Sequence, residues 1–156
     1  MGKLLTGIRT ALSRAEGWWF DATRRVQTEG YVAVYQVTFA ASGESGYDYS
    51  PTRPSTLRKI LAGLPVADLT EYTFVDIGSG KGRMLLVAAE YPFRKIVGIE
   101  FAGELHRQAE QNISRYRYAG RRCADVEAVH ADAMEYVFPD TKLILFLCYD
   151  RLPTLD

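Results

Sequence analysis

From residue 72 onward, the chain alternates between short apolar segments and segments with apolar residues at helical spacing. This alternation constrains the fold more than any other feature, because alternating strands and helices form a parallel sheet joined by right-handed crossovers. We therefore predict an α/β fold built on a doubly wound, mostly parallel sheet. The expected strands cover residues 73–77, 95–101, 126–130 and 142–148, and the expected helices cover residues 83–91 and 104–116.

The last expected strand, residues 142–148, is apolar at nearly every position after Lys142. A parallel strand that is buried on both faces has such a continuous hydrophobic run. We therefore expect this strand to be covered by helices on both sides.

Residues 1–70 form the expected N-terminal extension, which packs on a core of residues 71–156 in a single globular domain. The extension comprises an amphipathic helix, an aromatic cluster, a strand, a loop and a short helix. The cluster, Trp-Trp-Phe at residues 18–20, is expected to pack onto the core. Ser55 is expected to cap the short helix. The strand is expected at residues 31–39 and the loop at residues 41–54.

The composition excludes several classes of protein. The chain has 19 Lys and Arg against 19 Asp and Glu, so we expect neither a nucleic-acid partner nor a membrane surface, which both favour a basic excess. The longest apolar run, residues 143–149, is far shorter than the ~20 residues of a membrane span. Cys123 and Cys148 lie far apart, so we expect no metal site and no disulfide, and the predicted compartment is the cytoplasm.

Residues 75–83, Val-Asp-Ile-Gly-Ser-Gly-Lys-Gly-Arg, leave the first expected strand and enter the next helix. Nucleotide-like ligands bind at this place in an α/β sheet, because glycines allow close approach and helix N–H groups supply donors. The sequence does not match a phosphate-binding P-loop, since Gly82 occupies the position where that loop has Ser or Thr. A nicotinamide-dinucleotide loop is disfavoured, since Arg83 occupies its third glycine position.

The remaining pattern, an acidic residue followed by G-x-G-x-G, resembles motif I of the class I, seven-strand S-adenosylmethionine-dependent methyltransferases of the small bacterial type. Residues 96–101 resemble the second strand of that family with its terminal acid, and residues 130–133 resemble the turn after its third strand. With residues 18–21 and 49–51, which resemble the N-terminal region, the match covers most of residues 18–147. The residues of motif I are Asp76, Gly78, Gly80 and Gly82.

The resemblance implies a Rossmann-like sheet of four core strands in the order 3-2-1-4, with S-adenosylmethionine as the cofactor. The glycine loop, with Ser79, would pass against the amino-acid end and the ribose, and Asp76 would bind the ammonium group. Glu100 would accept the ribose hydroxyls, and adenine would contact Phe101, Asp132 and the backbone N–H of Ala133. Simpler interpretations remain open: Asp76 as a helix cap, Glu100 as a surface acid, and Asp132 as a turn residue.

The residues that would assist the methyl acceptor match the family less completely than the cofactor motifs do. In the related families, a residue after the fourth strand assists the acceptor; Asp150 can take that position here, but the Pro and aromatic residues that usually follow are missing. Tyr49, in the loop before the core, is the second catalytic candidate. Lys81 and Arg83 are expected to be surface or substrate-side charges.

The family fold continues beyond the fourth strand, so we expect a C-terminally short protein. The edge of that strand would be covered by the N-terminal elements or by a partner subunit in a homodimer, unless the chain is truncated. The predicted function is S-adenosylmethionine-dependent methyl transfer to an unidentified acceptor, a protein lysine or a small molecule. The alternative is a non-catalytic cofactor-binding remnant, or a fragment of a longer methyltransferase.

Overall fold

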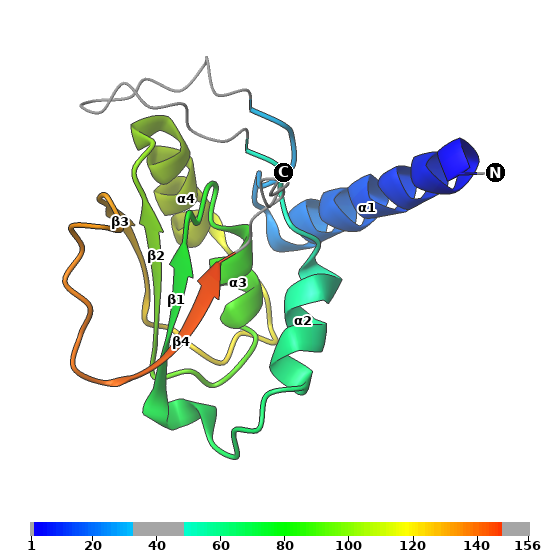
Figure 1. The fold of residues 1–156 in the computed structure, drawn as a ribbon. Coiled ribbons are helices and arrows are strands. Elements are labelled where there is room, and N and C mark those ends of the chain that lie inside the picture. The colour runs from blue at the N-terminus through cyan, green and yellow to red at the C-terminus, as the bar shows by residue number, and fades with distance from the viewer. Residues whose placement is uncertain (1, 33–48, 148–156) are drawn as a thin grey trace, which may run out of the picture.

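A four-stranded parallel sheet forms the centre of the computed structural model, which describes residues 2–32 and 49–147 (Figure 1). The strands lie in the order β3-β2-β1-β4, and every neighbouring pair is parallel. This arrangement confirms the predicted Rossmann-like α/β class and places the carboxyl ends of all four strands at one edge. The strands are β1 (Tyr72–Ile77), β2 (Lys95–Glu100), β3 (Val126–His130) and β4 (Lys142–Leu147).

One face of the sheet packs against helices. Side chains alternate between the two faces of a strand, and Phe74, Ile96 and Phe146 point to the face covered by helical residues such as Leu57 and Leu86. Two of the helices follow the strands as predicted, and the third comes from the N-terminal part. They are α3 (Arg83–Ala88), α4 (Gly103–Arg115) and α2 (Pro54–Ala62).

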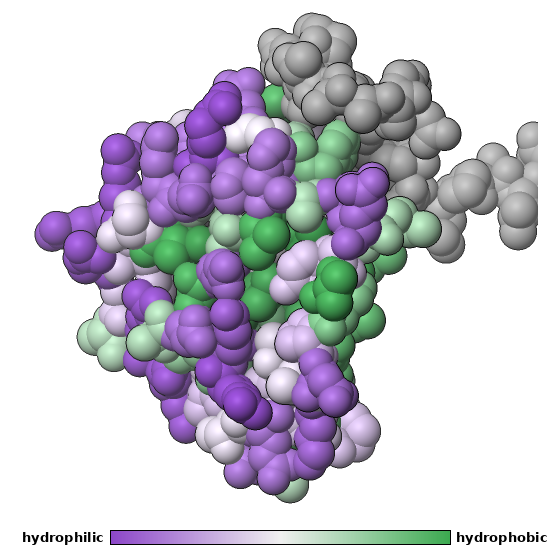
Figure 2. Space-filling view, turned by 90° about the vertical axis from the view of Figure 1, so that its left-hand side faces the viewer, coloured by the Kyte–Doolittle hydropathy of each residue, from purple (hydrophilic) through white to green (hydrophobic). Residues whose placement is uncertain are grey.

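The other face is covered differently. Val75, Val97 and Ile99 are buried there against residues of the connection between β3 and β4, including Tyr136. No helix of the described residues covers this face, and Leu145 and Leu147 of β4 are 56% and 60% exposed. The prediction that helices cover the fourth strand on both sides is therefore wrong for this part of the chain. Figure 2 shows hydrophobic surface open to solvent on this side of the molecule.

The first helix, α1 (Gly2–Arg24), extends away from the sheet, and only its carboxyl-terminal end meets the body (Figure 1). Phe20 is buried in the main hydrophobic cluster, but Trp18 and Trp19 are each 62% exposed. Successive helical residues point about 100° apart, so one face cannot bury all three. The expected packing of the aromatic cluster is therefore confirmed for Phe20 alone.

Helix α2 forms where it was expected, but Ser55 does not cap it. Arg53 is the N-cap residue and Pro54 the first helical residue, whereas the Ser55 hydroxyl and backbone N–H both donate to Glu16 of α1. Ser55 thus joins the two helices. The chain then passes through a short 3-10 helix, η2 (Leu69–Glu71), whose N-cap Asp68 accepts the Thr70 backbone N–H, before it enters β1.

The expected strand at residues 31–39 and the following loop fall largely outside the described residues. At their boundary, Val32 and Tyr49 form an isolated antiparallel bridge with two backbone hydrogen bonds of 3.1 and 2.8 Å. This bridge places Tyr49 next to the segment that follows α1.

Candidate functional site

The glycine loop between β1 and α3 lies at the carboxyl edge of the sheet. Gly78, Gly80 and Gly82 have φ angles of 76°, 54° and 81°, in the left-handed region. The backbone N–H groups of Gly78 and Ser79 donate to the carbonyl of Ile99 at 2.9 and 3.1 Å, which ties the loop to β2. The loop therefore turns sharply across the ends of both central strands.

Two of these glycines differ in their surroundings. A Cβ atom on Gly80 would lie 2.3 Å from the Tyr49 ring, whereas a Cβ on Gly78 would meet no atom within 4 Å. Tyr49 thus covers the loop at Gly80, and the loop is open at Gly78. The Ser79 hydroxyl lies against Gly98 of β2 and has no hydrogen-bond partner among the described residues.

Glu100, the last residue of β2, is buried beside this loop. Its Oε2 accepts the backbone N–H of Gly80 at 2.8 Å, and its Oε1 accepts that of Ala102 at 2.9 Å. Burial raises the pKa of Glu100, although the backbone N–H groups work in the opposite direction. An ionised carboxylate offers about four acceptor positions, and the backbone N–H groups of Gly80, Ala102 and Phe101 do not use all of them. Glu100 is therefore not a surface acid.

Asp76 of β1 is the second buried carboxyl group, only 3% exposed. Burial, and then the neighbouring charge of Glu100, raise the pKa of Asp76 well above its ordinary value. Gly82 is the N-cap residue of α3 and no side chain caps that helix, so Asp76 is not its cap. Two buried carboxyl groups at adjacent strand ends form a site suited to a cationic ligand.

The third strand end lies next to the second. The Ala131 backbone N–H donates to the carbonyl of Glu100 at 3.2 Å, and the His130 ring bonds the carbonyl of Phe101 at 2.8 Å. Phe101 is 45% exposed at this edge. The structure therefore brings the strand-end segments of the three predicted motifs together.

Asp132 and Ala133 lie in the turn after β3. Asp132 is exposed, and its Oδ1 accepts the Met134 backbone N–H at 2.8 Å, as in a simple turn. Ala133 packs on the open face of the sheet. The contact of both residues with adenine stays a prediction.

Only one of the two catalytic candidates lies within the described residues. Tyr49 lies on the glycine loop, and its hydroxyl donates to the carbonyl of Thr28 at 2.8 Å. Burial raises the pKa of Tyr49, so its phenol is neutral at physiological pH. Asp150 lies outside the described residues. A catalytic role for either residue stays a prediction.

The expectation that Arg83 is a surface or substrate-side charge is wrong. Arg83 is 3% exposed, and its Nε and Nη2 donate to Thr28 Oγ1 and Glu29 Oε2, both at 2.6 Å. Lys81 is also engaged, since its Nζ donates to the carbonyl of Glu29 at 3.0 Å. A single sequence carries no signal for these pairs, because the partners lie more than fifty residues apart in the chain.

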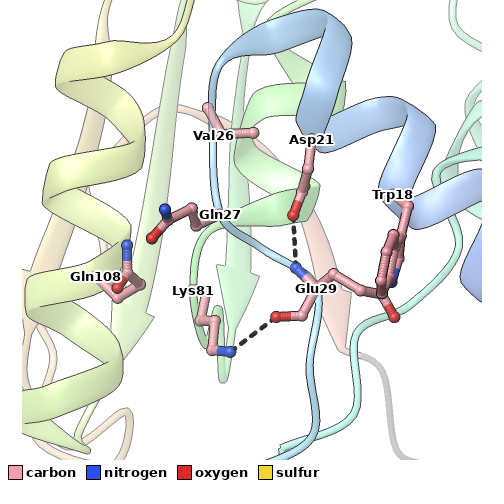
Figure 3. A pocket seen from close by; sticks show the side chains of 7 residues that line it. All are labelled: Trp18, Asp21, Val26, Gln27, Glu29, Lys81 and Gln108. Atoms are coloured by element: carbon pink, nitrogen blue, oxygen red, sulfur yellow. Dashed lines mark hydrogen bonds between the residues drawn. The ribbon is translucent and has the colours of Figure 1, made fainter.

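A surface pocket of about 600 Å³ lies beside this network, between α4, the end of α1 and the segment after it (Figure 3). None of the predicted cofactor residues lines it, so it is distinct from the strand-end site. Its lining residues are Trp18, Asp21, Val26, Gln27, Glu29, Lys81 and Gln108.

A comparison with models of protein families shows the family of this chain. The family model described as a methyltransferase domain matches residues 74–156, more than half of the chain. By this match, its motifs and its sheet order, the chain belongs to the class I S-adenosylmethionine-dependent methyltransferase family. No curated protein matches the chain.

Among solved structures, the chain is similar to an RNA methyltransferase from Salinibacter ruber in complex with S-adenosyl-L-homocysteine. The sequence identity is 26% and the TM-score 0.49. The similarity covers 64% of this chain and 61% of that chain, so the chain spans less than two thirds of that protein.

The cofactor of this family is S-adenosylmethionine, and the residues present fit it. The cofactor carries an ammonium and a sulfonium, and the site offers the buried carboxyl groups of Asp76 and Glu100. The backbone at Gly78 leaves open space for a ligand. Within residues 2–32 and 49–147, no His, Cys, Asp and Glu side chains are grouped to hold a metal ion. In those same ranges, no helix has the length and apolar character to cross a membrane.

Proposed function

We propose that this chain binds S-adenosylmethionine at the carboxyl ends of β1, β2 and β3 and transfers its methyl group to an acceptor, a protein lysine or a small molecule. The observation that carries the proposal is the pair of buried carboxyl groups, Asp76 and Glu100, beside a glycine loop that is open at Gly78. A buried acid pair without a cation is costly, and a cationic ligand removes that cost.

The proposed roles follow from the chemistry of each group. Asp76, buried at the carboxyl end of β1, binds the ammonium group, as the resemblance to the family implies. Glu100 accepts the ribose hydroxyls while it holds the Gly80 backbone N–H. Phe101 lies against the adenine face, and Asp132 with the Ala133 backbone binds the adenine edge.

When bound, S-adenosylmethionine supplies a methyl group on a positively charged sulfur. In the in-line displacement, the methyl group passes to the acceptor and the sulfur leaves as a neutral thioether. The protein has to orient the acceptor and exclude water. An amine acceptor must be neutral, so we assign Asp150 to accept its proton. Tyr49, packed on Gly80, lines the approach to the methyl group.

The test has two stages. The purified chain is first titrated with S-adenosylmethionine and S-adenosylhomocysteine, and binding is expected. It is then incubated with methyl-labelled cofactor and separate fractions of proteins, small molecules and RNA. Label in lysine or in a small molecule supports the proposal and identifies the acceptor class. Label in RNA would contradict it, and binding without transfer to any fraction would favour the cofactor-binding remnant.

The cytoplasm is the compartment we propose, from the wide spacing of Cys123 and Cys148. Cell fractionation tests it. Recovery of the protein from an oxidising compartment would contradict this assignment.

A further inference from the structure

Arg83 is placed where a cation is least favourable. It is the first residue of α3, directly after the N-cap Gly82, and the first turn of this helix contains no acidic residue. The N-terminus of a helix carries a partial positive charge, which repels a cation. Arg83 is nevertheless buried there. Such a residue needs strong compensation from elsewhere in the structure.

The compensation comes from the segment after α1, residues 26–30, which we name the strap. Arg83 donates to Thr28 Oγ1 and Glu29 Oε2, both at 2.6 Å. Asp21 of α1 lies 3.9 Å from the guanidinium, and its carboxylate accepts the backbone N–H groups of Thr28 and Glu29. The ion pair of Arg83 and Glu29 therefore fixes the strap against α1 and the start of α3. Figure 3 shows the Asp21 carboxylate on the Glu29 backbone N–H.

Asn112 of α4 attaches the strap to the glycine loop. It is fully buried, and its side-chain amide pairs with the backbone N–H and carbonyl of Gln27 at 2.8 and 3.1 Å. Its Nδ2 also donates to the carbonyl of Lys81 at 2.9 Å. One side chain thus holds a strap residue and a loop residue together.

The strap holds the loop at two further points. Lys81 Nζ donates to the carbonyl of Glu29, and the Tyr49 hydroxyl donates to the carbonyl of Thr28 while its ring packs on Gly80. The loop segment from Gly80 to Arg83 is therefore fixed from the strap side by side chains. Strand β2 fixes the same loop from the other side, through Glu100.

We propose that Arg83 is a positioning residue for cofactor binding: by anchoring the strap, it holds the glycine loop in its binding conformation and makes the N-terminal segment part of the cofactor site. This inference rests on the proposed function. The described hydrogen bonds of Arg83 go to the strap and not to a residue predicted to bind the cofactor, so we expect its effect to pass through Thr28, Tyr49 and the loop backbone.

The main test compares two buried arginines. Arg83→Lys keeps the charge, but lysine lacks the planar guanidinium fork with which arginine binds both strap partners at once. Arg24→Lys is the matched control, because Arg24 is equally buried and pairs with Glu90, beyond the far end of α3 from the loop. We expect Arg83→Lys to weaken S-adenosylhomocysteine binding about tenfold and Arg24→Lys to change it less than about twofold. Both variants are expected to lower the Tm.

A second pair of variants keeps the inference testable if Arg83→Lys fails to fold. Thr28→Val removes the hydroxyl that Arg83 binds, whereas Thr28→Ser retains it. We expect weaker binding for valine and recovery for serine. Hydrogen exchange without ligand gives an independent measurement, and the amides of Gly80 and Gly82 should exchange faster in Thr28→Val than in Thr28→Ser.

The outcomes separate this inference from the proposed function. If the wild-type chain does not bind S-adenosylhomocysteine, the proposed function fails. If it binds, but Arg83→Lys and Thr28→Val bind as tightly as the wild type, only the positioning role is overturned. Equal weakening by Arg24→Lys and Arg83→Lys would also overturn it, because the effect would then reflect general loss of stability.

Discussion

The carboxylate of Glu100 accepts the backbone N–H of Gly80 at 2.8 Å, so the last residue of β2 holds the glycine loop that leaves β1. Its second oxygen accepts the Ala102 backbone N–H at 2.9 Å. Glu100 therefore has a structural role, and its carboxylate still has acceptor capacity for a ribose hydroxyl.

Glu100→Ala is expected to affect both stability and binding. It leaves the buried N–H groups of Gly80 and Ala102 without their acceptor, at a cost of about 1–3 kcal/mol each. The free energy of cofactor binding should weaken by about 1–3 kcal/mol. Urea denaturation and calorimetry measure the two effects. Asp140→Asn, an exposed position in the connection between β3 and β4, is the control and should change both by less than about 0.5 kcal/mol. Unchanged affinity in Glu100→Ala would show that Glu100 is not the ribose ligand.

Asp76→Asn is expected to stabilise the ligand-free protein and to weaken cofactor binding. The pKa of Asp76 is raised by burial and by Glu100, so its ionised form destabilises the fold. A neutral amide removes that cost, and a gain of about 0.5–2 kcal/mol in the free energy of unfolding is expected at neutral pH. The amide cannot supply the negative charge for an ammonium group. Loss of stability together with unchanged affinity would contradict this assignment.

The pH dependence of the same variant has a defined sign. Because the folded pKa of Asp76 lies above its unfolded value, the folded state holds more protons between the two values. This contribution to stability is fully present below the unfolded pKa and is lost as pH rises through the folded pKa. The advantage of Asp76→Asn should therefore shrink as pH falls, in urea titrations of both proteins. An advantage that grows toward acid pH would exclude this cause.

Gly78→Ala separates backbone strain from ligand exclusion. Its φ of 76° makes a side chain strained by about 1–2 kcal/mol, but an added Cβ meets no protein atom within 4 Å. The variant should fold with a modest loss of Tm and bind the cofactor more weakly, because the methyl group enters the ligand space. Gly63→Ala, at the end of α2 with a φ of −93°, is the control and should bind normally. Normal binding by Gly78→Ala would place the cofactor elsewhere.

The exposed side of β4 predicts self-association. Leu145 and Leu147 form an apolar row on β4, the edge strand of the sheet that the described residues form, and such edges pair with other chains unless they are covered. We expect concentration-dependent dimers in light scattering, and we expect Leu145→Lys with Leu147→Lys to shift the protein toward the monomer. A monomer at every concentration would contradict this prediction.

The sheet could be predicted from the sequence because its signal is local. The apolar runs of β1 to β4 and the glycines after β1 define strands and a ligand loop without knowledge of distant partners. Motif spacing then indicated that Asp76 and Glu100 end adjacent strands, and the structure buries both at one edge.

The N-terminal half of the site could not be predicted in the same way. Arg83, Thr28 and Asn112 form pairs across large sequence separations, and each residue type is common on protein surfaces. Ser55 has the chemistry of a helix cap, but Pro54 already fits the first helical position, so the hydroxyl binds Glu16 instead. Tertiary packing, rather than local preference, decides these positions.

Calorimetric titration of the purified wild-type chain with S-adenosylhomocysteine tests the central claim most directly. We predict saturable binding to one site with a Kd in the micromolar range, lost or strongly weakened in Asp76→Asn. A protein that unfolds cooperatively in urea, yet shows no binding heat at two temperatures with this ligand or with S-adenosylmethionine, would contradict the cofactor site described above.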